Sequence, residues 1–262
     1  MVTLAKKLNG GTMSKFVDKL QNLSEAAVSP IGFHSSISES KSPAMLLIAG
    51  LSQLDAKEAE ILSQGNIDAG IMLSQDFDSE AARQMVAAAG KVPLGVLLKD
   101  AGEEKIEELA SFGCDFVVFH TRMSAIVLHR KEMGKLLMIE PSLNSNLVRI
   151  INGLDVDGVF LGCGEYSSVT VEHLLICQHF SELLDKPLIA ILPSLVRNEV
   201  VKDLWQIGVD GIVIPAAQPK ETFVGLRELI DNLPKEAKHR RTKVSAILPH
   251  YGGDVDVEEE DS

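Results

Sequence analysis

Short runs of aliphatic residues alternate with longer amphipathic stretches over most of the chain. Runs rich in Val, Ile, Leu and Met are typical of buried parallel strands, because both faces of such strands are covered. Eight of these runs predict strands at positions 44–51, 67–73, 92–98, 114–120, 135–140, 156–162, 187–192 and 209–215. Between them the apolar residues follow helical spacing, and Glu103–Phe112 places Ile106, Leu109 and Ala110 on one face.

Glycine often stands where a predicted helix passes into the next strand, which is typical of a helix C-terminus. The glycines in these positions are Gly90, Gly113, Gly134, Gly153 and Gly208. An aspartate follows soon after three of them, at Asp115, Asp157 and Asp210. These positions support a regular repeat of one strand and one helix.

Eight strand–helix units predict a single (β/α)8 barrel, the TIM barrel, which typically needs about 250 residues; the chain has 262. A doubly wound open sheet also alternates strands and helices, but it normally has fewer strands and a glycine-rich loop after its first strand. The loop after Leu51 reads SQLDAKEAE and contains no glycine. The barrel is therefore the predicted fold.

The two ends of the chain lie outside the repeat, so we expect three parts. Residues 1–42 should form a helix near 14–23 and a serine-rich loop that cap the barrel floor, and residues 43–234 the barrel itself. Residues 235–262 are basic and then acidic, and we expect a largely disordered tail. The basic cluster at 235–243 favours a solvated tail over a nucleic-acid contact, because an acidic run follows it.

Composition narrows the function classes. The formal net charge of −12 argues against a nucleic acid or an anionic membrane as partner. No apolar run approaches the roughly 18 residues that a membrane span needs. Three cysteines lack metal-ligand spacing, which predicts reduced thiols and a cytoplasmic location.

In a TIM barrel, function gathers where the strands end, because the loops that follow the strands converge there. The predicted strand ends deliver a ring of polar residues. Its ionisable candidates for catalysis are Lys99 after the third strand, and His120 and Arg122 after the fourth. A histidine bonded to a neighbour at the rim is the structural alternative for His120.

Glu140 closes the apolar run LLMIE, so we expect its side chain to project into the barrel mouth, where a carboxylate needs a partner to offset its desolvation. A salt bridge to Lys99 or Arg122 is one possible partner. A metal ion is the other, because Glu165 follows the next strand and two carboxylates from adjacent strands can share one hard cation. Mg²⁺ or Mn²⁺ would suit such oxygen ligands.

The segment LLMIEPSLNSNLVRIINGLDVDGVFLGCGEYSS, residues 136–168, resembles the metal-binding half of the HpcH/HpaI aldolase/citrate lyase family. The similarity continues through KPLIAILPSLVRNEVVKDLWQIGVDGIVI and covers roughly residues 92–214. The resemblance implies a TIM barrel with Mg²⁺ or Mn²⁺ on Glu140 and Glu165. It also implies that a small 2-oxo acid binds near Gly162, Cys163 and Gly164, and that a carbon–carbon bond is cleaved or formed through a metal-stabilised pyruvate enolate. Barrels of this family often form homo-oligomers through their outer helices.

The chain departs from the family pattern at three places. Glu165 stands where the family has Asp. The third strand reads LGVLLKD without the family's arginine, so that Lys99 is the nearest cation. After the second strand, Gln75 and Asp76 stand where the family's Glu and acid/base His are expected. Two hypotheses follow: a divergent metal-dependent lyase, or a catalytically impaired barrel that serves as a small-molecule-binding or assembly module.

Overall fold

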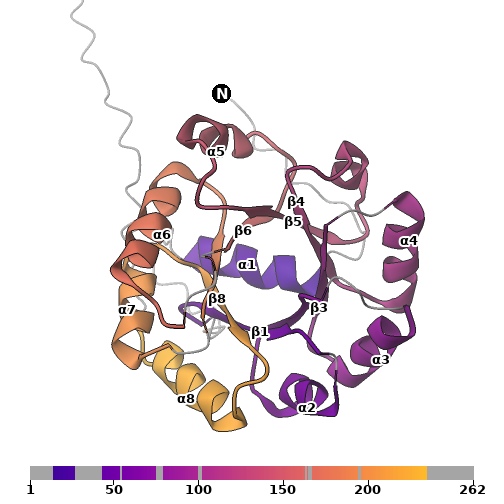
Figure 1. Ribbon diagram of the computed structural model, residues 1–262, viewed down its shortest axis with the longest axis horizontal. Helices are drawn as coiled ribbons and strands as arrows, with labels where there is room; N and C mark the ends of the chain where they lie inside the picture. The colour runs from indigo at the N-terminus through magenta and orange to yellow at the C-terminus, as the bar shows by residue number, and fades with distance from the viewer. Residues whose placement is uncertain are drawn as a thin grey trace, which may run out of the picture.

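Eight parallel strands close into a barrel in sequence order, with β1 paired to β2 on one side and to β8 on the other. The computed structural model describes residues 14–26 (side chains to 23), 43–53, 55–74, 79–99, 102–162, 164, 167–193 and 196–234 (Figure 1). Its strands are β1 (Leu46–Leu51), β2 (Ala69–Met72), β3 (Leu94–Leu98), β4 (Phe116–His120), β5 (Gly134–Ile139), β6 (Gly158–Gly162), β7 (Leu188–Ile191) and β8 (Gly211–Pro215). Its helices are α1 (Lys15–Ala26), α2 (Ala56–Gln64), α3 (Ser79–Ala89), α4 (Glu103–Phe112), η1 (Ala125–His129), α5 (Ser145–Ile151), α6 (Val171–Leu183), α7 (Asn198–Gln206) and α8 (Lys220–Asp231). The predicted TIM barrel is confirmed.

Alternation along each strand divides the core into two layers. In β1, Leu46 and Ile48 belong to the cluster inside the barrel, whereas Leu47, Ala49 and Leu51 belong to the cluster between the sheet and the outer helices. Both faces of every strand are therefore covered, which explains the continuous apolar runs in the sequence.

Helix α1 closes the floor, the end of the barrel where the strands begin. Figure 1 shows α1 lying across the barrel, and Phe16 and Leu20 are fully buried in the interior cluster. The ring of Phe16 stacks on that of Phe116 with the centroids 4.3 Å apart. The predicted capping helix is confirmed, although it ends three residues beyond the expected range.

Gly134 is not the end of a helix, and the prediction at this position is wrong. It is the first residue of β5, and a Cβ there would lie 2.7 Å from Val17 Cγ2 and 2.9 Å from Ser14 Oγ. Glycine is therefore needed for the close approach of α1. Gly113, by contrast, ends α4 with a φ of 91°, the left-handed conformation expected at a helix C-terminus.

The connection from β4 to β5 also departs from the expected repeat. We expected an amphipathic α-helix between these strands, but the described chain forms only the 3-10 helix η1. The β-branched pair Ile126 and Val127 lies in the middle of this segment and disfavours an α-helix. One face of the barrel is consequently covered by less helix than the others.

Four aspartates brace the floor, each directly before an even-numbered strand. Asp68 Oδ2 accepts a hydrogen bond from the backbone N–H of Leu47, at 2.9 Å. In the same way Asp157 accepts from Lys135 at 2.7 Å, and Asp210 from Leu188 at 2.8 Å. Asp115 binds α1 instead, accepting from Ser14 Oγ at 2.5 Å and from the Phe16 N–H at 3.0 Å.

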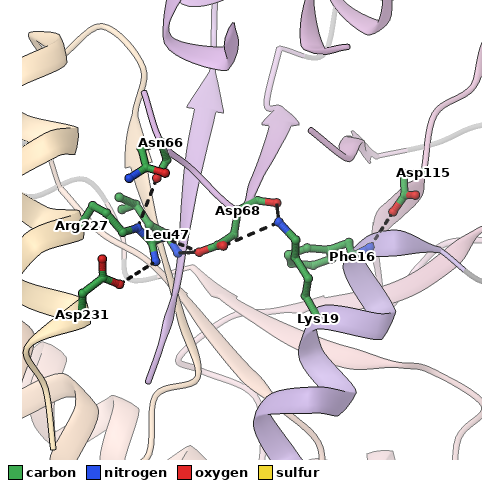
Figure 2. A network of polar contacts seen from close by, with 8 residues as sticks. All are labelled: Phe16, Lys19, Leu47, Asn66, Asp68, Asp115, Arg227 and Asp231. Carbon is green, nitrogen blue, oxygen red and sulfur yellow. Dashed lines mark hydrogen bonds and ion pairs between the residues drawn. The ribbon is translucent and has the colours of Figure 1, made fainter. Parts of the chain in front are cut away.

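Asp68 is the centre of the ionic network in Figure 2. Its carboxylate pairs with the Arg227 guanidinium of α8 and lies 3.6 Å from Lys19 Nζ of α1. Arg227 also donates to the Asn66 carbonyl at 3.2 Å and lies 3.6 Å from Asp231 Oδ1. One carboxylate thus joins α1, β1 and α8 at the bottom of the barrel.

Cys114 and Cys177 are both buried. Burial, reinforced by the negative charge of Asp115, raises the pKa of the Cys114 thiol to about 12, although Lys105 opposes the shift. The reactive thiolate is then about one part in 10⁴ at pH 8.

We expect iodoacetamide at pH 8 to label Cys114 at least about 10³-fold more slowly in the native protein than in urea, as followed by peptide mass spectrometry. Equal rates in the two states would contradict the burial.

Candidate functional site

At the C-terminal ends of three neighbouring strands, the last residue on the inward side is ionisable. Val118 of β4 and Met138 of β5 lie in the interior cluster, and His120 and Glu140 follow two residues later on the same side. Lys99 follows Leu97 of β3 in the same way. We call Lys99, His120 and Glu140 the polar half of the mouth.

The strand register makes these residues neighbours. Leu98 of β3 pairs with Phe119 of β4, so Lys99 and His120 occupy the next position of the same ladder. His120 pairs with Met138, two residues before Glu140. Lys99 and His120 are therefore neighbours at the C-terminal end of the strands, and Glu140 stands on the adjacent strand two positions beyond the level of His120.

The side chains of the polar half take no part in the described interactions that stabilise the fold. Lys99 and Glu140 are exposed and His120 is half-buried. None of the three side chains forms a hydrogen bond or ion pair with another described residue. The aspartates at the floor differ from them, because their carboxylates are bonded to backbone N–H groups or paired with cations.

The expected burial of Glu140 is wrong, and one of its two possible partners is absent among the described residues. Its carboxylate is exposed, so the burial that was expected to demand a partner is absent. It forms no salt bridge with Lys99 or Arg122. The physical reason is that β5 ends at Ile139, so Glu140 stands one residue beyond the ladder at the open rim.

Arg122 lies apart from the strand ends, in the turn after β4. Its side chain is exposed, and the turn is closed by the Met123 N–H, which donates to the His120 carbonyl at 3.0 Å. Arg122 thus stands in a turn and not at the end of a strand.

Gly162 provides open space next to the polar half. A Cβ at this position would have Met138 Sδ as its nearest atom, at 3.9 Å. Gly164 is exposed with a φ of 81°, a conformation that favours glycine. Cys163 and Glu165 lie outside the described residues, as do Gln75 and Asp76, so their predicted roles stay predictions.

Ser52 and Gln53, at the exit of β1, are bound to a residue that sequence reasoning missed. Glu58, only 2% exposed, accepts from the Ser52 N–H at 2.9 Å, the Ser52 hydroxyl at 3.2 Å and the Gln53 N–H at 3.1 Å. The sequence feature that could have indicated this residue is a glutamate in the first turn of the helix that follows a strand. The Glu58 carboxylate holds the loop between β1 and α2 in place.

The opposite side of the mouth is apolar. Leu73 after β2 and Ile191 at the end of β7 are half-buried and pack on the interior cluster. Pro215 ends β8 two residues after the interior Val213. We call Leu73, Ile191 and Pro215 the apolar half of the mouth.

The described residues contain no group of three or more His, Cys, Asp or Glu side chains that could hold a metal ion by themselves. No described helix has the length and apolar character required to cross a bilayer. Among the described residues, the most exposed large aliphatic side chains lie on α5 and α6, at Leu147, Ile150, Val171 and Leu175. Homo-oligomer formation stays a prediction.

The closed barrel of parallel strands, surrounded by helices, defines the chain as a TIM barrel. Comparison with known proteins agrees at the level of fold. A tryptophan synthase alpha subunit from the hyperthermophile Pyrococcus furiosus superposes with a TM-score of 0.54 and 11% identity, over 73% of this chain and 98% of the other. A protein from Aquifex aeolicus VF5 gives a TM-score of 0.55 and 15% identity, over 86% and 98%. No family model and no curated protein matches the sequence.

Proposed function

We propose that the chain is a carbon–carbon lyase of the aldolase type that acts on a small 2-oxo acid at the barrel mouth. One observation carries this proposal: β3, β4 and β5 present Lys99, His120 and Glu140 as neighbours whose side chains the described fold leaves unbonded. Such groups at the C-terminal end of a TIM barrel lie where enzymes of this fold hold their chemistry.

Each residue of the polar half has a role in this chemistry. Lys99 holds the carboxylate of the substrate by its charge, with Arg122 as a second cation at the rim. In the cleavage direction, His120 takes the proton of the substrate hydroxyl group as the carbon–carbon bond breaks and then returns it to the enolate carbon. In the synthesis direction, the proton moves from carbon to oxygen by the same route. The open space at Gly162 admits the 2-oxo group close to the backbone.

A divalent cation fits the residues present, although only one of its expected ligands is described. The Glu140 carboxylate is exposed and has no cation partner in the described chain, so it is available as an oxygen ligand. Mg²⁺ often takes one or two protein carboxylates, with water and substrate oxygens completing the octahedron. Mg²⁺ or Mn²⁺ on Glu140, with Glu165 as the second ligand, would act as a Lewis acid toward the oxo group.

The motif resemblance to the HpcH/HpaI aldolase/citrate lyase family supports this proposal, and we propose that the chain is a divergent member of that family. The tryptophan synthase alpha subunit supports only the architecture, because its identity to this chain is 11%. Lys99 in place of the family's arginine keeps the charge but loses bidentate binding, so slow turnover is expected.

Thermal melting with and without Mn²⁺ tests the metal site. At a concentration of 100 times the Kd we expect the Tm of the wild type to rise by about 5 °C, because a ligand that binds the native state stabilises it. Glu140→Ala should lose the rise. Glu60→Ala, which removes an exposed glutamate of α2, is the matched control and should keep it. The absence of a shift in the wild type would overturn the metal site.

Decarboxylation of oxaloacetate tests the chemistry directly, because it passes through the same enolate. We expect activity in the wild type with Mn²⁺ and its loss in Gly162→Val, whose side chain fills the open space with no close contact at Cβ. Equal melting of the two proteins would confirm that the variant folds. A wild type without activity would overturn the lyase and favour the alternative of a catalytically impaired binding module.

A further inference from the structure

The two halves of the mouth differ in chemistry, and this difference constrains the substrate. The polar half is built from the ends of β3, β4 and β5, and the apolar half from the ends of β7, β8 and β2. Because the barrel is closed in sequence order, the polar half is a continuous arc, and in the apolar half only β1 lies between β8 and β2. A ligand that lies across the mouth therefore meets charge at one end and hydrocarbon at the other.

The apolar half forms one continuous surface. Gly50 of β1 pairs with Pro215, and a Cβ at Gly50 would lie 2.9 Å from Leu73 Cδ1 and 3.1 Å from Val213 Cγ1. The Leu73 side chain thus leans over β1 toward β8 and fills the place that a side chain at Gly50 would take. Glycine here lets the aliphatic surface run from β2 to β8 without a break.

The polar side chain at the end of β1, next to this surface, is already hydrogen-bonded within the protein. Ser52 follows Gly50 on the inward side of β1, but its hydroxyl donates to Glu58 Oε1 and its N–H donates to the same atom. Ile191 is half-buried against the interior cluster and offers only a methyl surface. The described inward residues of this half therefore offer a substrate no unbonded polar side chain.

We propose that the substrate is an amphiphilic 2-oxo acid, whose carboxylate and oxo group lie on the polar half and whose aliphatic chain lies over Leu73 and Ile191. This inference rests on the proposed function and names its substrate class. Burial of hydrocarbon on hydrocarbon is favourable, whereas a second carboxylate on the apolar half would lose its water without a partner. A dicarboxylic 2-oxo acid should therefore bind more weakly than a monocarboxylic one of the same length.

Calorimetric titration of the whole chain, with Mg²⁺ present, tests the substrate class. The ligands are pyruvate, 2-oxobutyrate, 2-oxopentanoate and 2-oxohexanoate, with 2-oxoglutarate as the five-carbon dicarboxylate matched to 2-oxopentanoate. We expect the Kd to fall roughly three- to fourfold for each methylene that is buried. We also expect 2-oxoglutarate to bind at least tenfold more weakly than 2-oxopentanoate.

Two variants locate the effect. Ile191→Thr keeps a β-branched side chain but places a hydroxyl on the apolar half, and it should flatten the dependence of Kd on chain length. Val224→Thr makes a comparable change on α8, where the residue is 40% exposed, and should leave that dependence unchanged. Thermal melting confirms that both variants are folded.

The outcomes separate the inference from the proposed function. Binding of 2-oxo acids with no dependence on chain length, or with 2-oxoglutarate as the tightest ligand, would overturn the inference and leave the proposed function standing. An unchanged dependence in Ile191→Thr would overturn the placement of the chain over the apolar half. Failure of every 2-oxo acid to bind would overturn the proposed function itself.

Discussion

Asp68→Ala should lower the free energy of unfolding by about 3 kcal/mol, because removal of one partner leaves a buried charge without compensation. The Asp68 and Arg227 side chains are only 14% and 9% exposed. The variant also removes the acceptor of the Leu47 N–H and the carboxylate near Lys19. Arg227 keeps its contacts with Asn66 and Asp231, which places the cost at the lower end for a broken buried pair. Urea unfolding followed by circular dichroism measures the loss.

Asp231→Ala is the matched control, because it removes the other carboxylate that pairs with the same arginine. Asp231 is 56% exposed and 3.6 Å from Arg227 Nη1, so we expect a loss of less than about 0.5 kcal/mol. Similar losses in the two variants would contradict the view that burial, and not the number of ion pairs, makes the Asp68 network important.

Gly95→Ala should destabilise the barrel by about 3 kcal/mol through overpacking of its interior. A Cβ at Gly95 would lie 2.1 Å from Cε2 of the Phe116 ring, and Phe116 is fully buried. That ring has little freedom to move away, since it stacks on Phe16 of α1 with the centroids 4.3 Å apart. One methyl group in β3 should therefore disturb both β4 and the helix that closes the floor. Urea unfolding again gives the magnitude.

A double-mutant cycle tests this cause. Phe116→Leu alone should cost about 1 to 2 kcal/mol, because it shortens a buried side chain. Combined with Gly95→Ala it should recover part of the stability, so that the double variant is more stable than Gly95→Ala alone. Additive losses would show that the methyl group acts through the backbone of β3 and not through the Phe116 ring.

Most of the fold could be predicted from the sequence because it depends on local patterns. The apolar runs predict the eight strands, and spacing together with Gly113 predicts both ends of α4. Gly134 shows the limit, since a glycine can serve a positive φ or a close approach, and only the position of Val17 tells which. The role of Asp115 was equally hidden, because its partner Ser14 lies 101 residues away in the sequence.

The candidate site was predictable in position but not in environment. Alternation along β4 and β5 places His120 and Glu140 on the inward side. The exposure of Glu140 could not be predicted, because it depends on where β5 ends relative to its neighbours. Cys163 and Glu165, outside the described residues, keep their roles as predictions.

The separation of the floor aspartates from the mouth has a consequence for how this chain can change. Bonds to carboxylates brace strands and α1 at one end of the barrel, whereas the side chains of the polar half contribute no described bond at the other. Substitutions in the polar half therefore cost the scaffold little, and selection can exchange the chemistry there while the foundation stays intact. The same division makes the barrel a suitable host for grafted active sites, because a designer can rewrite the rim and leave Asp68, Asp115, Asp157 and Asp210 in place.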